Sequence, residues 1–421
     1  MSLWPLRALP SWLRRRLLSP PMLPAAAAPD GVRQILVDVS VIIHHDARTG
    51  IQRVVRALLT HLHARAINGT SVRPVFASRN HGYCNALLTV DGQLAPVNGR
   101  GGALQPVLAR RGDIFLGLDL AAHILPYVEP ELAHWRRDGV AINMMVYDLL
   151  PVLRPGWFPP RTARRFDLWL GVLARQADRC ICISRDGAKA LAKELSARSA
   201  DPLPEVATIP LGSDLAASHP SRGLPADIAS LRQWLRCHRV LLSVGTIEPR
   251  KGHQQLLAAL SRHWQAEPTS DIALLVVGRP GWKTADLQAQ LRDHPEQGAR
   301  LIWLDGASDE LLSEVYTCVA GLVAASHGEG FGLPLIEALA HGTPVLARDL
   351  PVFREIGESL FDYFDDDAPE PLAARLQSWL DQARRPSAET VAALPRWTDS
   401  VAALARCIGV LLADDGKGVA A

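Results

Sequence analysis

Two carboxylates flank a glycine-rich stretch in the C-terminal half of the chain, where residues 326–338 read SHGEGFGLPLIEA. Glu329 lies among the glycines, and Glu337 follows eight positions later. An apolar run ends at Ser326 and Pro334 suits the first turn of a helix, so the stretch is predicted to join a strand to a helix. Glycines let backbone amides approach a ligand, and a helix start offers unpaired N–H groups to anionic or hydroxyl-rich groups. A tight turn would explain the glycines alone, but two acids at one junction favour a ligand site that includes Gly330, Phe331, Gly332 and Leu333.

Two adjacent cations, Arg250 and Lys251, follow a second apolar run that ends in Gly245. A departing diphosphate gains negative charge, which a planar arginine fork and a lysine point charge stabilise. A solvated basic pair at a turn is the simple alternative. Because the two acids lie in the same half of the chain, we favour a diphosphate site at Arg250 and Lys251, with Thr246 among its binding residues.

The N-terminal half offers a third candidate at Gly50, which opens a predicted helix directly after Thr49. A glycine at a helix start can cradle an anion, and this one would face the donor phosphates across a cleft. A simple helix cap formed by Thr49 is the alternative. His44 and His45 lie nearby in the sequence and are equally well interpreted as surface residues.

Asp148 is the fourth candidate, because it follows the apolar run of residues 140–147. An acid at the end of a buried strand either positions a substrate or caps a turn, and the residues alone leave both readings open. Asp119 follows another apolar run in the same way and is a weaker candidate.

These candidates lie at the ends of apolar runs that alternate with amphipathic stretches. In the first half the strand-like runs are residues 35–43, 114–117, 140–147, 180–184 and 206–211, and the longest helical stretch covers residues 161–177. In the second half the strand candidates are residues 240–245, 272–278, 301–304, 319–326 and 344–347, with helices at 254–264, 284–291, 309–316 and 334–340. Such alternation predicts an α/β fold with mostly parallel sheets covered on both faces, which bind ligands at the carboxyl ends of their strands.

The segment around the two acids resembles the Glu-x7-Glu motif of the retaining glycosyltransferase family 4, with its Gly-Phe-Gly-Leu-Pro core intact. The likeness covers most of residues 37–412 and implies the GT-B fold, in which two Rossmann-like doubly wound domains face a central cleft. It assigns Glu329 to hydroxyls of the donor sugar and Glu337 to the ribose hydroxyls of the nucleotide. It assigns Lys251 to the phosphates, and we infer that Arg250 replaces the arginine that many members carry at the position of Thr246.

The resemblance also implies an activity and its partners. The expected reaction moves a hexosyl group, with retention, from a nucleotide diphosphate sugar to a glycan or lipid-linked glycan during surface polysaccharide synthesis. The Glu-Pro-Arg-Lys wording at residues 248–251 favours mannose from GDP-mannose. Asp148 matches the family, whereas Tyr147 stands where many members carry a histidine near the reacting sugar. We recognise no metal-binding Asp-x-Asp motif beside these residues, so we expect neither a metal ion nor a cofactor other than the donor.

A chain of 421 residues is too long for one core and predicts two domains. We expect a leader at residues 1–30, an N-terminal acceptor-side domain at 31–215 and a linker at 216–236. A C-terminal nucleotide-sugar-binding domain at 237–390 and a final segment at 391–421 complete the chain. That segment is expected to hold a helix that crosses back to the first domain, followed by a tail.

Composition limits the partners and the location. The formal net charge of +2 provides no basic field of the kind that binds nucleic acid. Six scattered cysteines fit buried thiols in a reducing compartment, and no apolar run reaches the roughly 18 residues that span a bilayer. We therefore expect a cytoplasmic protein. The leader, rich in Arg, Trp and Pro, is interpreted either as disordered or as a basic, aromatic patch at residues 1–20 on the inner face of the cytoplasmic membrane.

Three other functions share parts of this pattern. A nucleotide-sugar epimerase or a phosphorylase shares the fold, but its additional catalytic groups, such as a pyridoxal-binding lysine, have no signature here. A non-catalytic sugar-nucleotide-binding relative stays open because of Tyr147, although the acids and cations are intact. A nicotinamide dehydrogenase is the weakest alternative, since no Gly-x-Gly-x-x-Gly follows a first strand.

Overall fold

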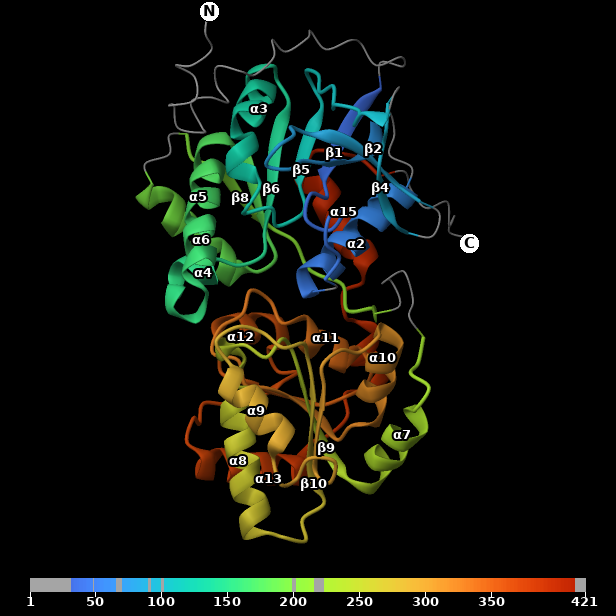
Figure 1. Ribbon diagram of the computed structural model, residues 1–421, viewed down its shortest axis with the longest axis vertical. Coiled ribbons are helices and arrows are strands. Elements are labelled where there is room, and N and C mark those ends of the chain that lie inside the picture. The colour runs from blue at the N-terminus through green and yellow to red at the C-terminus, as the bar shows by residue number, and fades with distance from the viewer. Residues whose placement is uncertain are drawn as a thin grey trace, which may run out of the picture.

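A computed structural model describes residues 32–412, apart from residues 48, 66–69, 90–91, 100–101, 199–201 and 216–222. The predicted leader and its membrane contact at residues 1–20 lie outside the described residues. Figure 1 shows two domains stacked along the long axis, with the strands β1 to β8 in the upper one and β9 to β14 in the lower one. None of the helices in the described part of the chain is long and apolar enough to cross a membrane.

The N-terminal domain is built on an eight-stranded sheet with the order β4-β3-β2-β1-β5-β6-β7-β8. All neighbours from β2 to β8 are parallel, and β3 and β4 add an antiparallel edge. Its strands are β1 (Arg33–Asp38), β2 (Thr70–Phe76), β3 (Cys84–Leu88), β4 (Leu94–Pro96), β5 (Ile114–Gly117), β6 (Ala141–Val146), β7 (Arg179–Cys182) and β8 (Glu205–Thr208). Its helices are α2 (Gly50–Ala64), α3 (Leu125–Arg137), α4 (Leu150–Leu153), η3 (Pro155–Trp157), α5 (Pro160–Gln176) and α6 (Arg185–Ala197).

The C-terminal domain is built on a six-stranded parallel sheet with the order β11-β10-β9-β12-β13-β14. Its strands are β9 (Arg239–Val244), β10 (Ile272–Val277), β11 (Leu301–Leu304), β12 (Gly321–Ala324), β13 (Val345–Arg348) and β14 (Asp362–Phe364). Its helical elements are α7 (Ile228–Cys237), η5 (Pro249–Lys251), α8 (His253–Ala266), α9 (Ala285–Asp293), α10 (Asp309–Cys318), α11 (Leu333–Ala340), α12 (Pro351–Gly357), α13 (Pro369–Gln382) and α14 (Ala388–Ala392). The predicted α/β class with two doubly wound, mostly parallel sheets is confirmed.

Alternate residues of each central strand enter opposite cores, as the period of two in a strand requires. In β1, Val37 packs under α2, whereas Leu36 packs under α3 and α5. In β9, Leu242 packs on one face of the second sheet and Leu241 packs on the other. Both faces of both sheets are therefore covered, which explains why these strands appear in the sequence as mainly apolar runs rather than as alternating apolar and polar residues.

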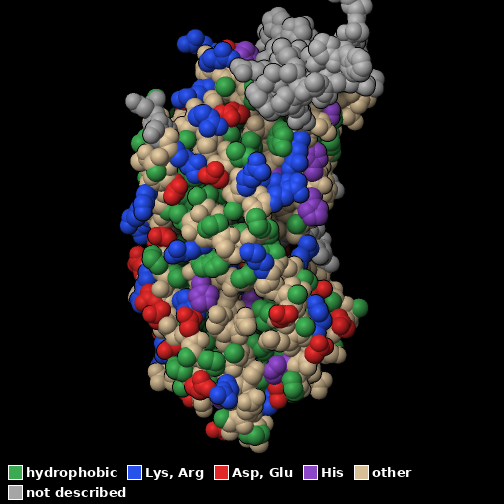
Figure 2. All heavy atoms as spheres, turned by 60° about the vertical axis from the view of Figure 1, so that its left-hand side comes forward, with side chains coloured by type: hydrophobic (Ala, Val, Ile, Leu, Met, Phe, Trp, Pro, Cys, Tyr) green, Lys and Arg blue, Asp and Glu red, His purple; other side chains and the backbone are tan. Residues whose placement is uncertain are grey.

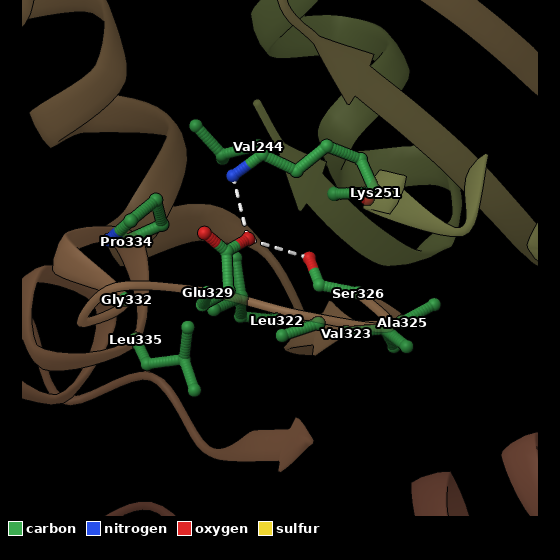
Figure 3. A pocket seen from close by; sticks show the side chains of 12 residues that line it. Val244, Lys251, Leu322, Val323, Ala325, Ser326, Glu329, Gly332, Pro334 and Leu335 are labelled. Carbon is green, nitrogen blue, oxygen red and sulfur yellow. Dashed lines mark hydrogen bonds and ion pairs between the residues drawn. The ribbon is translucent and has the colours of Figure 1, made fainter. Parts of the chain in front are cut away.

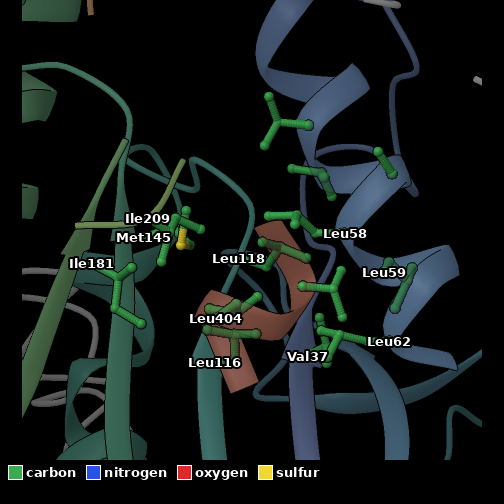
Figure 4. Packing of buried hydrophobic residues seen from close by; sticks show 14 of the residues in the cluster. Val37, Leu58, Leu59, Leu62, Leu116, Leu118, Met145, Ile181, Ile209 and Leu404 are labelled. Carbon is green, nitrogen blue, oxygen red and sulfur yellow. The ribbon is translucent and has the colours of Figure 1, made fainter. Parts of the chain in front are cut away.

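The last helix, α15 (Trp397–Cys407), returns to the N-terminal domain and lies against α2. Trp397, Val401 and Leu404 join the core under α2, and Figure 4 shows Leu404 among Leu58, Leu116 and Leu118. The incoming and outgoing connections run side by side at this point. The Ser213 N–H donates to the Pro395 carbonyl (3.0 Å), and the Trp397 indole N–H donates to the Asp214 carbonyl (3.0 Å).

Two predicted segments differ from the sequence-based expectations, and four strands were not expected. The predicted strand at residues 35–43 ends at Asp38, because the Asp119 carboxylate accepts the N–H groups of Val41 (2.8 Å) and Ile42 (2.7 Å) and so holds a turn. The predicted linker at residues 216–236 contains most of α7, whose apolar face packs on the core of the C-terminal domain. The strands β2, β3, β4 and β14 are additions to the predicted set.

Candidate active site between the two domains

The glycine-rich loop lies between the end of β12 and the start of α11 and faces the N-terminal domain. The Ser184 hydroxyl, at the end of β7, donates to the Gly330 carbonyl at 2.9 Å. A side chain at Gly330 would collide with the carbonyl of Tyr147 at the end of β6. Gly332 has a φ of +116°, a conformation that favours glycine. The loop therefore meets the carboxyl ends of β6 and β7, where doubly wound sheets bind ligands.

Glu329 is the centre of the polar contacts in this loop. Its carboxylate accepts hydrogen bonds from Arg250 (2.6 Å), Lys251 (2.6 Å) and the hydroxyl of Ser326 (2.7 Å). Figure 3 shows it between the Lys251 ammonium and Ser326. Burial disfavours the charged form, but the attraction of Arg250 and Lys251 outweighs it and lowers the pKa of Glu329 to about 2. Glu329 is thus a fixed carboxylate, suited to accepting hydrogen bonds from sugar hydroxyls.

Arg250 uses its guanidinium to join three parts of the site. Nη1 donates to Glu329 and to the Gly328 carbonyl (2.8 Å), and Nη2 lies 2.8 Å from the carboxylate of Glu248. Burial would lower the pKa of Arg250, but the surrounding carboxylates raise it above its ordinary value. Within the described part of the chain, the second carboxylate oxygen of buried Glu248 has no hydrogen-bond partner. Arg250 therefore fixes the loop and leaves an acceptor of Glu248 unsatisfied.

Lys251 is held differently, because its long side chain lies over the backbone of Gly245. A Cβ atom at Gly245 would lie 3.2 Å from Lys251 Cε, so glycine gives the lysine room. The ammonium donates to Glu329 and lines a small pocket with Glu329, Gly332 and Pro334. Two of the three ammonium donors remain for a ligand. Thr246 follows Gly245 and lies beside Gly281.

Asp148 approaches the same cluster from the N-terminal domain. Burial raises its pKa, while the charges of Arg250 and Lys251 oppose that rise. One carboxylate oxygen accepts the Leu150 N–H at 3.0 Å, so the turn cap foreseen from the sequence is present. Tyr147 points away from the cleft, because its hydroxyl donates to the Leu118 carbonyl inside the first domain at 2.6 Å. The tyrosine hydroxyl therefore does not take the place of the histidine.

Glu337 belongs to a neighbouring network rather than to the Glu329 cluster. It is buried, accepts the Tyr316 hydroxyl (3.0 Å) and forms an ion pair with Arg53 of the other domain. Arg53 also pairs with Asp309 at 2.9 Å. Gly50, at the start of the same helix α2, lies close to Leu333, since a Cβ there would be 3.8 Å from the Leu333 side chain. Leu333 and Phe331 pack against the core of the N-terminal domain.

The structure thus brings Glu329, Arg250, Lys251 and Asp148 together and sets Glu337 on a second network beside them. The sequence interpretation did not single out Arg53, Glu248 or Glu355. The Glu355 carboxylate accepts the backbone N–H groups of Arg185 (2.6 Å) and Asp186 (2.9 Å) and so caps α6 across the domain boundary. Arg53 lies on the face of α2 opposite the apolar stripe of Val54, Leu58 and Leu62, where cations are common, so its residue type and position gave no signal of this contact.

Parts of the chain match known glycosyltransferases. Residues 237–392 match the family model described as Glycosyl transferases group 1. Over 368 residues the chain is 38% identical to the serotype-specific mannosyltransferase WbdA of Escherichia coli, a match that covers 85% of this chain and 43% of the relative. Over 181 residues it is 33% identical to a D-inositol 3-phosphate glycosyltransferase of Rhodococcus erythropolis, covering 42% of this chain and 39% of the relative. The chain spans less than half the length of these curated relatives.

Solved structures share the whole architecture. Sucrose-phosphate synthase from Thermosynechococcus elongatus superposes with a TM-score of 0.62 at 19% identity, over 89% of this chain and 98% of that one. Anabaena HepE in complex with UDP and glucose superposes with a TM-score of 0.56 at 14% identity, over 89% and 95% of the two chains. The predicted arrangement of two Rossmann-like domains facing a cleft, the GT-B fold, is confirmed.

Proposed function

We propose that this chain is a retaining, metal-independent glycosyltransferase of the family 4 type that transfers a hexosyl group from a nucleotide diphosphate sugar to a glycan or lipid-linked glycan. The observation that carries the proposal is the partly buried cluster of Glu329, Arg250 and Lys251, which lies where the carboxyl ends of strands from both sheets meet. The match of residues 237–392 to a glycosyltransferase model supports it.

The cluster suggests a division of labour between the two cations. Both terminal nitrogens of Arg250 bind the loop and carboxylates, whereas within the described residues the Lys251 ammonium donates to Glu329 alone. Lys251 would therefore neutralise the charge that develops on the departing diphosphate, and Arg250 would hold Glu329 in place. Glu329 would accept hydroxyls of the donor sugar, with Glu248 as an additional acceptor. The closed cleft would keep water from the donor and so limit its hydrolysis.

For the donor we favour GDP-mannose, because 85% of this chain is similar to part of the mannosyltransferase WbdA. A glycan of surface polysaccharide, carried by a lipid, is the corresponding acceptor, and such a reaction would take place at the inner face of the cytoplasmic membrane. Arg53 pairs with one oxygen of Glu337, so the ribose would share or displace this ion pair.

The test is a transfer assay on three variants of the full chain. Lys251→Ala and Glu329→Ala should each lower turnover at least about a hundredfold, because each removes charge stabilisation from the reacting centre. Lys193→Ala, which removes an exposed lysine of α6, is the matched control and should leave turnover unchanged. Unchanged turnover in both site variants would remove the proposed site.

Thermal shifts with a panel of nucleotides and nucleotide sugars would identify the donor, because a ligand of the native state raises the melting temperature. A shift with GDP-mannose but with no transfer to any acceptor would favour a non-catalytic relative. Formation of an epimer from the donor alone would favour an epimerase of the same fold.

A further inference from the structure

Glu248 is the least exposed of the charged residues around Glu329, and one of its oxygens has no partner. Its side chain is 3% exposed, whereas that of Arg250 is 14% exposed. One carboxylate oxygen lies 2.8 Å from Arg250 Nη2. The other oxygen is buried, and no N–H or O–H group among the described residues donates to it. A buried oxygen that bears charge and accepts no hydrogen bond is destabilising, so the geometry of Glu248 suits a bound ligand or a proton.

The acids around Glu329 outnumber the cations. Three acids and two cations influence one another there, namely Asp148, Glu248, Glu329, Arg250 and Lys251. His253 lies beside them, but burial and the charge of Lys251 lower its pKa to about 4, so it is neutral near pH 7. With every acid ionised, this part of the described structure would hold one more negative charge than positive charge.

Of the three acids, Glu248 is the best placed to hold a proton. Glu329 stays ionised, because its pKa is about 2 and it accepts hydrogen bonds from both cations. Burial raises the pKa of Asp148, but the Leu150 N–H donates to its carboxylate at 3.0 Å and favours the ionised form. Burial also raises the pKa of Glu248, opposed by the two cations and assisted by the other two acids. A proton on the unpartnered oxygen of Glu248 would leave its other oxygen to Arg250.

We propose that Glu248 binds the nucleotide sugar in its protonated form, so that the donor and one proton bind together. This inference rests on the proposed function, which places the donor diphosphate and its two negative charges beside Lys251. Added negative charge favours the neutral form of a nearby acid. The proton comes from solvent and stays on the second oxygen of Glu248, where it is donated in a hydrogen bond to an oxygen of the donor. A protonated carboxyl keeps acceptor capacity, so Glu248 can also accept from a sugar hydroxyl.

The exposed acids of the C-terminal domain provide the reference for this proposal. Figure 2 shows Asp and Glu side chains at the surface of the lower, C-terminal half, where water solvates their charge. Glu389, in the first turn of α14, is an exposed acid of this domain. Its charge is unrelated to the donor site, so Glu389→Gln is the matched control.

Calorimetric titration of the full chain with GDP-mannose counts the protons. Each phosphate of this ligand keeps a single charge near neutral pH, so the ligand itself takes up no proton. Binding enthalpies measured near pH 7 in buffers with different heats of ionisation should give an uptake of about one proton in the wild type. Over the pH range of this uptake, the dissociation constant should rise up to about tenfold per pH unit.

Glu248→Gln keeps the shape of the neutral acid but cannot titrate. It should bind GDP-mannose without proton uptake and with an affinity that does not change with pH, whereas Glu389→Gln should behave like the wild type. If Glu248→Gln melts early, Glu248→Ala replaces it, because it removes the same titrating group. Asp148→Asn tests the other acid whose pKa is raised.

Three results would overturn the proposal: binding without proton uptake in the wild type, undiminished uptake in Glu248→Gln, or an equal loss in Glu389→Gln. Uptake that is lost in Asp148→Asn but kept in Glu248→Gln would assign the proton to Asp148 and would also overturn it. A donor other than GDP-mannose can replace it in the titration, because every nucleotide diphosphate sugar has the same diphosphate. The proposed function fails separately, if no nucleotide sugar binds or if binding with proton uptake is followed by no transfer.

Discussion

The guanidinium of Arg53, on α2 of the N-terminal domain, forms an ion pair with the buried carboxylate of Glu337 on α11 of the C-terminal domain. This pair joins the two domains at the residue to which the sequence resemblance assigns the nucleotide ribose. The acid is therefore oriented by the Tyr316 hydroxyl and paired with a cation that the protein itself supplies.

Arg53→Ala should lower the free energy of unfolding by about 3 kcal/mol, because it leaves the carboxylate of Glu337 buried without its cation. It should also enlarge the radius of gyration, since one of the cross-domain contacts is lost. Urea unfolding and small-angle scattering measure the two effects. A double-mutant cycle with Glu337→Gln isolates the pair, and a coupling energy near zero would contradict its role.

Gly330→Ala should lower turnover about a hundredfold, because the new Cβ would collide with the Tyr147 carbonyl and displace the loop that carries Glu329. Gly306→Ala is the matched control, since a Cβ there meets no atom within 4 Å. The assay is transfer at saturating donor. Equal activity of the two variants would show that the loop tolerates movement away from β6.

Lowering the pH should lower the free energy of unfolding through protonation of Glu329. Its pKa is about 2 in the folded protein, against 4.5 for an ordinary glutamate in an unfolded chain, so its contribution is complete above pH 4.5 and is lost as the pH falls towards 2. The contribution is about 3 kcal/mol. Urea midpoints of wild type and Glu329→Gln should differ most near pH 6 and converge near pH 2. Asp365→Asn, which removes an exposed carboxylate outside this cluster, is the matched control.

Raising the pH should lower the free energy of unfolding through Asp38. This pH dependence is opposite in direction to that of Glu329, because the pKa of Asp38 is raised in the folded protein. Burial, opposed by a hydrogen bond from Ser40 and assisted by the charge of Asp119, raises the pKa of Asp38 to about 7. Its stabilising contribution is complete below pH 3.8 and is lost as the pH rises through 7. Asp38→Asn should therefore gain stability relative to wild type between pH 5 and pH 8. A difference that is constant across this range would contradict a titrating Asp38.

The elements that carry the Glu329 cluster could be predicted from sequence because their signals are local. The strands β6, β9 and β12 are buried on both faces and appear as mainly apolar runs, which only Asn143 and Ser243 interrupt. The glycines of residues 328–332 mark the strand-to-helix junction directly. Edge strands gave no such signal. Arg73 and Pro74 interrupt β2, and only part of that strand is buried.

The cross-domain contacts could not be predicted, because they depend on how two separately folded sheets face each other. Nothing near Arg53 in the sequence indicates Glu337, which lies 284 residues away. The same holds for Ser184, whose hydroxyl donates to the Gly330 carbonyl 146 residues away. The helix α7 was not predicted for a different reason. Turn-forming residues directly precede it, so its short helical pattern of apolar residues was assigned to the linker.

The return of α15 to the first domain makes the two lobes share two covalent crossings that run side by side at Ser213 and Pro395. Two adjacent crossings act as one hinge, so the lobes can swing open about that line but cannot twist freely around each other. A single proteolytic nick in either crossing would leave the halves tethered by the other. Separating them would require cutting both crossings, and the N-terminal fragment would then lack the Trp397 side chain that fills its core.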